Sequence, residues 1–338
     1  MRFDLEVDVR RGAVVESRHR LQCAIADAQG TLVGGTARAG LVTMFRSSAK
    51  PFQLLPLVER GHADRIGFSD EQLAVMTSSH TGSRYHLELV AGVLARVGPG
   101  PENLACGYHE PEDPASRDDV LRAGAPRTAL YNNCSGKHAG MLALALAEGW
   151  PIEGYHRPEH PMQQLFRQVI ADCCGVPAAS LEAGVDGCNL PVFGMPLAAM
   201  ARGYALLASA RPGAADARTR ALARIARAMG EHPRAVEGDG RTATQLMAAT
   251  GGRVVAKGGA EGLLLVALTD RGLGFAIKCE DGASRAIAPA AIAVLEHLGA
   301  LPAAERAALE ALRRPPVRNA VGAVVGSLET SLREVALA

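Results

Sequence analysis

Residues 262–278 read GLLLVALTDRGLGFAIK, and this stretch decides the fold class. Two short apolar runs, residues 262–268 and 274–278, flank the polar and glycine-containing link 269–272. Apolar runs of this length, bounded by turn-forming residues, are typical of buried strands. The stretch therefore predicts a β-hairpin in the last quarter of the chain.

Further strands are expected near both ends of the chain. Residues 21–27 alternate modestly and precede a turn at 28–30 and a second run at 31–34, which predicts another hairpin. Short β-type runs are also expected at 253–256 and 321–325. We therefore predict an α/β (α+β) three-layer fold, in which an antiparallel sheet is built from both termini.

Helices are expected to fill the middle of the chain. The apolar patterns predict helices over residues 50–61, 83–97, 135–148, 161–174, 197–210, 214–229 and 242–249, and two more at 286–298 and 303–313. Residues 69–72, SDEQ, match a capping box that opens a further short helix. Residues 98–126 are rich in Pro, Gly and charge and predict a long loop. We expect one catalytic unit over 1–338, with a sheet subdomain at roughly 1–60 and 250–338 and a helical subdomain at roughly 61–249.

Composition excludes several classes of function. The chain has 338 residues, 48% of them hydrophobic, a formal net charge of +1 and 4% aromatic residues. This balance favours neither nucleic acid nor an anionic membrane as a partner. No apolar run is long enough to span a membrane, and the N-terminal residues lack the apolar core of a signal peptide, so we expect a cytoplasmic protein. Seven cysteines, an odd number, argue against a disulfide framework.

The first candidate for chemistry is Ser47, three residues before Lys50 in the sequence RSSAKPFQ (46–53). Pro51 is tolerated in a first helical turn, so a helix should begin near Ser47 or Ser48. A neutral Lys50 on the same face could then take the proton of the Ser47 hydroxyl. Taken alone, the pattern fits a capping serine and a solvated lysine better.

Two polar clusters follow. Residues 77–83, TSSHTGS, form either a functional loop around Ser79 or a plain helix connection, and the segment itself favours neither. Residues 131–140, YNNCSGKHAG, place a thiol (Cys134), an amine (Lys137) and an imidazole (His138) at one helix start. A helix N-terminus lowers the pKa of a thiol, which favours a functional role for this segment.

Two more segments add candidates. Residues 186–191, DGCNLP, form a turn in which Cys188 is an unusual polar-loop cysteine. Cys134 and Cys188 could supply half of a zinc site, completed by Lys137, His138, Asp186 or water. In residues 256–262, AKGGAEG, Lys257 follows a strand and precedes glycines, as in the Lys-Thr-Gly element of serine acyl transferases. A solvated lysine before a turn explains that segment slightly better when it is taken alone.

Together these segments resemble the rhizobial-type (class 3) L-asparaginases, the asparaginase II family. The motifs are residues 46–53, 78–82, 132–141, 186–193 and 256–262, and the resemblance covers roughly residues 14–325. It implies a fold like serine β-lactamases and glutaminases, although Ser79-His80-Thr81 replaces the Ser-Asp-Asn element of the β-lactamases. It also implies a homodimer that hydrolyses L-asparagine to L-aspartate and ammonia.

The resemblance also implies roles for individual residues. It points to two Ser–Lys pairs, Ser47 with Lys50 and Ser79 with Lys257, and to a zinc site of Cys134, Lys137 and Cys188, with Arg46, His138 and Asp186 holding substrate or the metal shell. Our hypothesis is acyl transfer with Ser47 as nucleophile and Lys50 as base, while Ser79 and Lys257 relay protons. Arg46 or another cation would pair with the α-carboxylate of the substrate and Asp186 with its α-ammonium.

Several alternatives stay open at this point. Ser79 could be the nucleophile, with Ser47 in the relay. A cysteine amidase could use Cys134 with His138. A related Ser–Lys amidase or glutaminase could act on another amide, and a protein that only binds zinc or an amino acid is the alternative without catalysis.

Overall fold

The computed structural model describes residues 1–124 and 126–336. All strands of its main sheet pair with their neighbours in antiparallel fashion. Within these residues it is eight-stranded, in the order β10-β11-β1-β2-β9-β8-β7, with β3 paired to β2. Its strands are β1 (Phe3–Arg11), β2 (Val14–Asp27), β3 (Leu32–Gly35), β7 (Val254–Gly259), β8 (Leu263–Leu268), β9 (Leu273–Cys279), β10 (Pro316–Arg318) and β11 (Val324–Glu334).

Both predicted hairpins are confirmed. Strand β8 pairs with β9 across the tight link at Leu268 and Leu273, and β2 pairs with β3. Every residue of β8 is buried, because helices cover both faces of the sheet at its centre. Helix α8 (Leu197–Ser209) packs against β2, β8 and β9, and helix α12 (Ile287–His297) packs against β1, β9 and β11. This is the three-layer α/β arrangement expected from the sequence.

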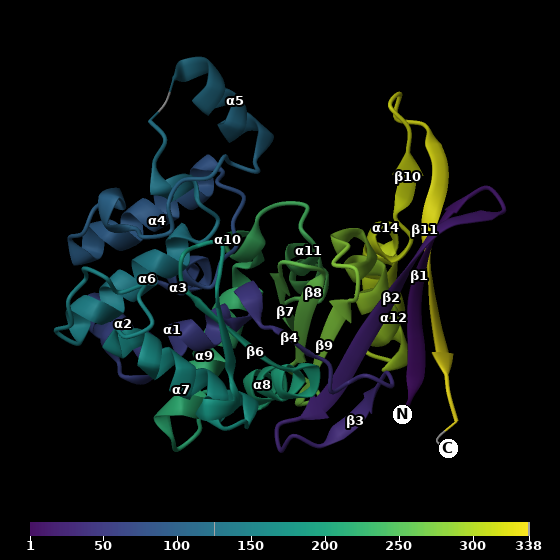
Figure 1. The fold of residues 1–338 in the computed structure, drawn as a ribbon, viewed down its shortest axis with the longest axis horizontal. Coiled ribbons are helices and arrows are strands. Elements are labelled where there is room, and N and C mark those ends of the chain that lie inside the picture. Colours follow the sequence, from purple (N-terminus) through teal and green to yellow (C-terminus); the bar gives the residue numbers. More distant parts are fainter. Residues whose placement is uncertain (125, 337–338) are drawn as a thin grey trace.

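The two termini meet inside the sheet. Strand β1 pairs with β11 from Phe3↔Glu334 to Arg10↔Ser327, so the first and last strands are direct neighbours (Figure 1). This confirms that the sheet is built from both ends of the chain. Strand β1 was not predicted, although FDLEVDVRR alternates. The final strand expected at 321–325 is β11, which extends nine residues further, to Glu334.

The helices of the middle region follow their sequence signals closely. Those predicted are α1 (Lys50–Glu59), α3 (Asp70–Met76), α4 (Arg84–Val97), α6 (Ser135–Ala147), α7 (Pro161–Cys174), α9 (Ala217–Glu231) and α11 (Thr242–Ala249). Two short helices, α2 (His62–Ile66) and α10 (Pro233–Glu237), were not predicted. The predicted capping box is present, since the Ser69 side chain accepts from the Gln72 N–H and the Gln72 side chain accepts from the Ser69 N–H. Among the described residues, no helix is long and apolar enough to cross a membrane.

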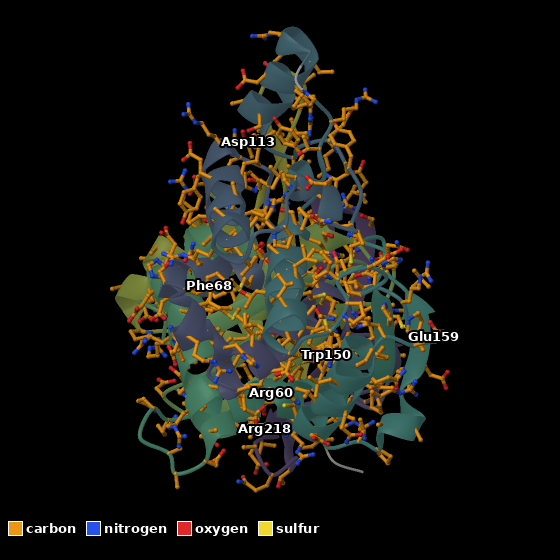
Figure 2. All side chains as sticks on the ribbon, turned by 90° about the vertical axis from the view of Figure 1, so that its left-hand side faces the viewer. Arg60, Phe68, Asp113, Trp150, Glu159 and Arg218 are labelled. Atoms are coloured by element: carbon orange, nitrogen blue, oxygen red, sulfur yellow. The ribbon has the colours of Figure 1, made fainter. Side chains whose placement is uncertain are left out.

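Three expectations were wrong. Residues 98–126 are not all loop, because α5 (Pro114–Ala123) starts there, with the Asp113 carboxylate accepting from the Ser116 N–H at 2.8 Å. Asp113 lies at the base of this projecting helix (Figures 1 and 2). The helix expected at 303–313 is split into α13 (Ala303–Ala308) and α14 (Glu310–Arg313). Helices were expected to fill the middle of the chain, but β5 (Glu182–Val185) and β6 (Pro191–Pro196) lie there and form a second sheet with β4 (Val42–Met44).

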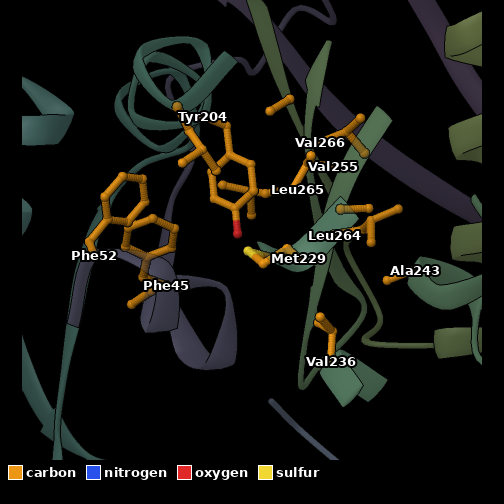
Figure 3. Packing of buried hydrophobic residues seen from close by; sticks show 14 of the residues in the cluster. Phe45, Phe52, Tyr204, Met229, Val236, Ala243, Val255, Leu264, Leu265 and Val266 are labelled. Carbon is orange, nitrogen blue, oxygen red and sulfur yellow. The ribbon is translucent and has the colours of Figure 1, made fainter. Parts of the chain in front are cut away.

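One hydrophobic cluster joins the sheet to the helices. It contains Phe45 and Phe52 from the segment around α1, Tyr204 from α8 and Leu265 from β8. The rings of Phe52 and Tyr204 lie 5.8 Å apart in an edge-on arrangement, and Phe45 lies 5.8 Å from Phe52 (Figure 3). This packing fixes the start of α1 against the sheet, which is where the candidate site lies.

Candidate active site

A pocket of about 320 Å³ opens between the edge strand β7 and the helical region. The sequence-predicted serines Ser47 and Ser79 both line it, although they come from different parts of the helical region. The other lining residues are Glu112, Asn133, Glu237, Arg241, Thr242, Gly258, Gly259, Ala260, Gly262, Leu263, Leu264, Ser284 and Ile287. The pocket therefore has four hydroxyls, one amide and three charged side chains on walls that are otherwise glycine or apolar, as binding sites for small molecules have.

Ser47 lies in a 3₁₀ turn, residues Arg46–Ala49, that leads directly into α1 at Lys50. The helix itself starts slightly later than predicted, with Pro51 in its first turn. Two buried hydrogen bonds hold the turn in place: Ser48 Oγ donates to the Lys257 carbonyl at 3.0 Å, and the Tyr204 hydroxyl donates to the Ser48 carbonyl at 2.9 Å. Ser47 is thus presented to the pocket by a turn that is tied to both β7 and α8.

The Ser79 hydroxyl lies between two buried amines. Lys50 Nζ is 2.8 Å from Ser79 Oγ and also donates to the Ser78 carbonyl, while Lys257 Nζ is 3.0 Å from Ser79 Oγ. A hydroxyl oxygen has two lone pairs and one proton, so it can bond to both amines at once. Among the described residues no hydrogen bond joins Ser47 Oγ to Lys50, so the structure brings Lys50, Ser79 and Lys257 together and leaves Ser47 beside them.

Lys50 is suited to lose its proton near neutral pH. Its side chain is buried, and this burial lowers the pKa of the ammonium from 10.5 to about 8. The positive charges of Lys137 and Lys257 lower the pKa further, while the Cys134 sulfur opposes them. At a pH near 8 a large fraction of Lys50 is therefore the free amine, which is the form that accepts a proton.

Lys257 is held by a carboxylate that the sequence did not reveal. Glu237, the last residue of α10, is buried and accepts from Lys257 Nζ at 2.7 Å and from the Gly258 N–H at 2.8 Å. Lys257 Nζ also donates to the Gly258 carbonyl at 2.9 Å. An acidic residue beside a turn gives no sequence signal for a partner twenty positions away, so Glu237 was not a candidate.

Cys134, Lys137 and Cys188 form a second buried cluster behind the Ser47 turn. Lys137 Nζ donates to Cys188 Sγ at 3.0 Å, and the Cys188 thiol donates to Asp186 Oδ2 at 3.8 Å. The neighbouring Cys188 thiol and the charges of Lys137 and Lys50 hold the pKa of Cys134 well below its ordinary value despite burial. Burial lowers the pKa of Lys137, but the two sulfurs outweigh it and raise the pKa. The cluster therefore favours a thiolate next to an ammonium.

Arg46 and Asp186 pair with each other. Arg46 Nε donates to Asp186 Oδ1 at 3.0 Å, and Arg46 adopts a left-handed φ of 48° that a non-glycine residue rarely takes. Burial raises the pKa of Asp186, but Lys137 and Arg46 outweigh it and lower the pKa. This pair ties the Ser47 turn to the loop of Cys188, and neither residue is among the described residues that line the pocket.

His138 and His80 support the site from behind. The His138 ring is buried and its Nδ1 lies 2.6 Å from the Tyr155 hydroxyl, while burial and the Lys137 and Lys50 charges lower its pKa well below the usual value. His80 Nε2 lies 2.8 Å from Ser135 Oγ, which joins the Ser79 loop to the start of α6. The polar segment 77–83 therefore supplies one pocket residue and one structural histidine.

The geometry thus offers two hydroxyls, an amine that is partly neutral, a carboxylate-held second amine and a cluster of sulfur and nitrogen atoms. This combination is suited to activating a serine for attack on a carbonyl carbon. A family model described as L-asparaginase II matches residues 7–330, nearly the whole chain. No curated protein matches the chain. The resemblance drawn from the motifs is confirmed: the chain belongs to the L-asparaginase II family, the amidohydrolases of the L-asparaginase type.

Proposed function

We propose that the protein hydrolyses L-asparagine to L-aspartate and ammonia through a serine ester. The observation that carries this proposal is the pair of buried amines, Lys50 and Lys257, that meet the Ser79 hydroxyl in the wall of a pocket shared with Ser47. The family supplies the class of reaction, and this constellation supplies a base, a nucleophile and a proton relay.

In the first step the neutral Lys50 amine takes the proton of Ser47, and Ser47 Oγ forms a bond to the side-chain amide carbon of the substrate. The carbon–nitrogen bond then breaks, and the leaving nitrogen takes a proton and departs as ammonia. That proton reaches it from Lys50 through Ser79, whose oxygen lies 2.8 Å from Lys50 Nζ. In the second step Lys50 takes a proton from water, and the water oxygen bonds to the ester carbon. The bond from that carbon to Ser47 Oγ then breaks, Lys50 returns the proton to Ser47 Oγ, and L-aspartate leaves.

The hydrogen bonds decide which serine we assign to which role. Ser79 Oγ bonds to both amines, at 2.8 and 3.0 Å, which suits a group that passes protons between them. Ser47 lies three residues before Lys50, lines the same pocket and has a hydroxyl that is free to approach the substrate. Mass spectrometry of acid-quenched enzyme tests the assignment: Ser79→Ala should still form the aspartyl ester on the peptide of Ser47, and Ser47→Ala should form none. An ester retained in Ser47→Ala assigns the nucleophile to Ser79.

We also propose that Cys134, Lys137 and Cys188 hold a zinc ion. Two sulfurs and one amine converge in a buried cluster, and sulfur is a preferred ligand of Zn²⁺. Binding requires Lys137 and Cys188 to lose their protons, so affinity should rise with pH. When bound, the ion would supply a fixed positive charge behind Lys50. Arg46, Asp186 and His138 would lie around it, and the Arg46–Asp186 ion pair would hold the Ser47 turn next to the metal site.

Metal analysis of the purified protein tests the zinc site, with Cys188→Ser as the variant and Cys173→Ser as a control from a buried cysteine on α7. We expect zinc in the native protein and in the control, and none in Cys188→Ser. Exhaustive chelation that leaves both the rate and KM unchanged rules out a role for the ion in turnover. The homodimer expected from the family resemblance is tested on the same samples by sedimentation.

Two other activities are less well supported. A cysteine amidase would need Cys134 near a base and open to substrate, but Cys134 is 4% exposed and His138 is bonded to Tyr155 instead. A glutaminase differs only in the length of the substrate chain. Ammonia release from L-asparagine, L-glutamine and simple amides is therefore the decisive assay, and release from glutamine alone would replace asparagine as the substrate we propose.

A further inference from the structure

An ion pair lines the same pocket as the two serines. Glu112 precedes α5, Arg241 precedes α11, and their side chains are joined by an ion pair. Among the described residues that line the pocket only Glu112, Glu237 and Arg241 are charged, so Arg241 is its one cation there. Glu237 is already engaged by Lys257 and Gly258. Glu112 and Arg241 are thus the charges in the pocket wall that a ligand can reach.

Glu112 is held at a defined place relative to Ser79. The Asp113 N–H donates to the carbonyl of Thr81 at 2.8 Å, and Thr81 is two residues after Ser79. Figure 2 shows Asp113 where the projecting α5 meets the body of the molecule. On the other side, Arg241 is the residue directly before α11, whose N-terminus has no side-chain cap, and Thr242, the first residue of the helix, also lines the pocket. A carboxylate is favoured beside such a helix start and a guanidinium.

We propose that Glu112 and Arg241 are the residues that recognise the charged end of the substrate. On this assignment, which rests on the function proposed above, Arg241 pairs with the α-carboxylate and Glu112 with the α-ammonium of L-asparagine. The reacting amide then points toward Ser47 and Ser79. The direct ion pair opens, and one zwitterion bridges the two side chains in its place.

Exposure makes such an exchange inexpensive. The side chains of Arg241 and Glu112 are 44% and 42% exposed, and ion pairs this accessible to water contribute little to stability. The Arg46–Asp186 pair differs, because its side chains are only 25% and 11% exposed and the Asp186 carboxylate also accepts hydrogen bonds from the Gly187 N–H and the Cys188 thiol. Breaking that pair would disturb the Ser47 turn, whereas opening the Glu112–Arg241 pair disturbs only the pocket entrance.

The test removes one charge from the protein and one from the substrate. Succinamate is L-asparagine without the α-ammonium, and 3-aminopropanamide is L-asparagine without the α-carboxylate. We expect Arg241→Gln to lower kcat/KM at least about 10-fold on L-asparagine and on succinamate. Its kcat/KM on 3-aminopropanamide should stay within about twofold of the wild-type value. Glu112→Gln should lower kcat/KM on L-asparagine and 3-aminopropanamide and spare succinamate. Where an analogue turns over too slowly, its inhibition constant against L-asparagine is compared instead.

Matched controls separate recognition from loss of structure. Arg234 lies in the same segment, pairs with Asp239 and is not among the described pocket residues, so Arg234→Gln should leave all three substrates unchanged. Equal losses on all three substrates in Arg241→Gln or Glu112→Gln, or no loss at all, overturn the proposal. If the substrate pattern appears in Arg46→Gln and Asp186→Asn instead, recognition belongs to that pair, and the proposal for Glu112 and Arg241 is also overturned.

The outcome also distinguishes this proposal from the proposed function. If the wild-type protein hydrolyses L-asparagine but the two variants do not show the substrate pattern, only the recognition by Glu112 and Arg241 is disproved. Wild-type protein that releases no ammonia disproves the proposed function. Calorimetric titration with L-asparagine and the two analogues then still tests recognition, since the same pattern of lost affinity must appear in the two variants.

Discussion

Two buried lysines of the same site have pKa values that move in opposite directions. Lys50 and Lys137 each lie in the first turn of a helix, α1 and α6, and burial alone lowers the pKa of both ammonium groups. For Lys50 burial prevails and the pKa falls to about 8. For Lys137 the Cys134 and Cys188 sulfurs outweigh burial, and the pKa rises.

The difference lies in the groups that each amine contacts. Lys50 Nζ bonds to neutral oxygens, those of Ser78 and Ser79, while Lys137 Nζ bonds to the sulfur of Cys188, and the Cys134 and Cys188 sulfurs both raise its pKa. Neutral partners do not offset the loss of water around a buried charge, whereas an anion does. This difference supports the proposed roles, in which Lys50 is the base and Lys137 a fixed cation that would exchange its proton for the proposed metal ion.

Removing each lysine should give the largest contrast. Lys50→Met deletes the base and should reduce kcat by about 10³-fold, within the range typical of a general base. Lys137→Met keeps the base and should reduce kcat by no more than about 10-fold. Ammonia release measures both, and thermal unfolding shows that each variant is folded. Equal losses in the two variants contradict the division of roles.

The third lysine of the site extends the comparison, because a carboxylate holds it. Glu237→Gln leaves the buried Lys257 without its anion, and removal of one partner from a buried ion pair costs about 3 kcal/mol of stability. We expect the free energy of unfolding to fall by about that amount and kcat to fall about 10-fold, as the relay through Ser79 loses its geometry. Denaturant unfolding measures the first and ammonia release the second.

The exposed Glu231, at the end of α9, provides the control for this variant. Glu231→Gln should change neither quantity. A Glu237→Gln protein as stable and active as the native one shows that Lys257 does not depend on its carboxylate. In that case Lys257, like Lys50, is held by neutral partners alone.

The sequence predicted the serines and lysines of this site but not their charge balance. Ser47, Lys50, Ser79 and Lys257 stood out because they lie in motifs of small polar residues. The structure places all four at one junction, yet it is Ser79 that bonds to both amines. Spacing along a helix could suggest the pairing of Ser47 with Lys50, but it could not show which hydroxyl the amine contacts, because the Ser79 loop comes from another element.

Glu237, Glu112 and Arg241 were beyond the reach of sequence reasoning for a related physical reason. Each lies next to a turn or at a helix end, where a charged residue is ordinary and usually solvated. Their partners are distant in sequence, so no period or spacing indicates them. The fold was easier: β8, β9 and α7 have the apolar runs and caps that define them locally. Strand β1 and helix α5 were missed because their many charged residues weaken that apolar signal.

The pH dependence of the native enzyme tests the assignment of Lys50 more finely. The base must be neutral, so kcat/KM should rise with pH and level off above the pKa of Lys50, which is about 8. Well below that pH only the unprotonated fraction reacts, and the rate should fall about tenfold per pH unit. A rate that is constant from pH 6 to 10, or that falls as pH rises through 8, contradicts a lysine base.

The smallest effect probes the thiolate that both lysines share. The Cys134 sulfur raises the pKa of Lys50 against the effect of burial, so Cys134→Ser should lower that pKa and move the rise in kcat/KM below pH 8, by a fraction of a unit. The assay uses metal-free protein, in which the charge at this place is that of the thiolate. Activity at pH 7 should then increase relative to the plateau, because more of Lys50 is neutral.

Cys173→Ser is the matched control for this shift. Burial raises the pKa of the Cys173 thiol to about 12, so the thiol is neutral in the assay and its loss removes no charge. The control should keep its inflection near pH 8. If the two variants shift alike, or Cys134→Ser moves the inflection upward, the sulfur is not the anion beside Lys50. The opposite pKa shifts of Lys50 and Lys137 then have a cause other than the groups that each amine contacts.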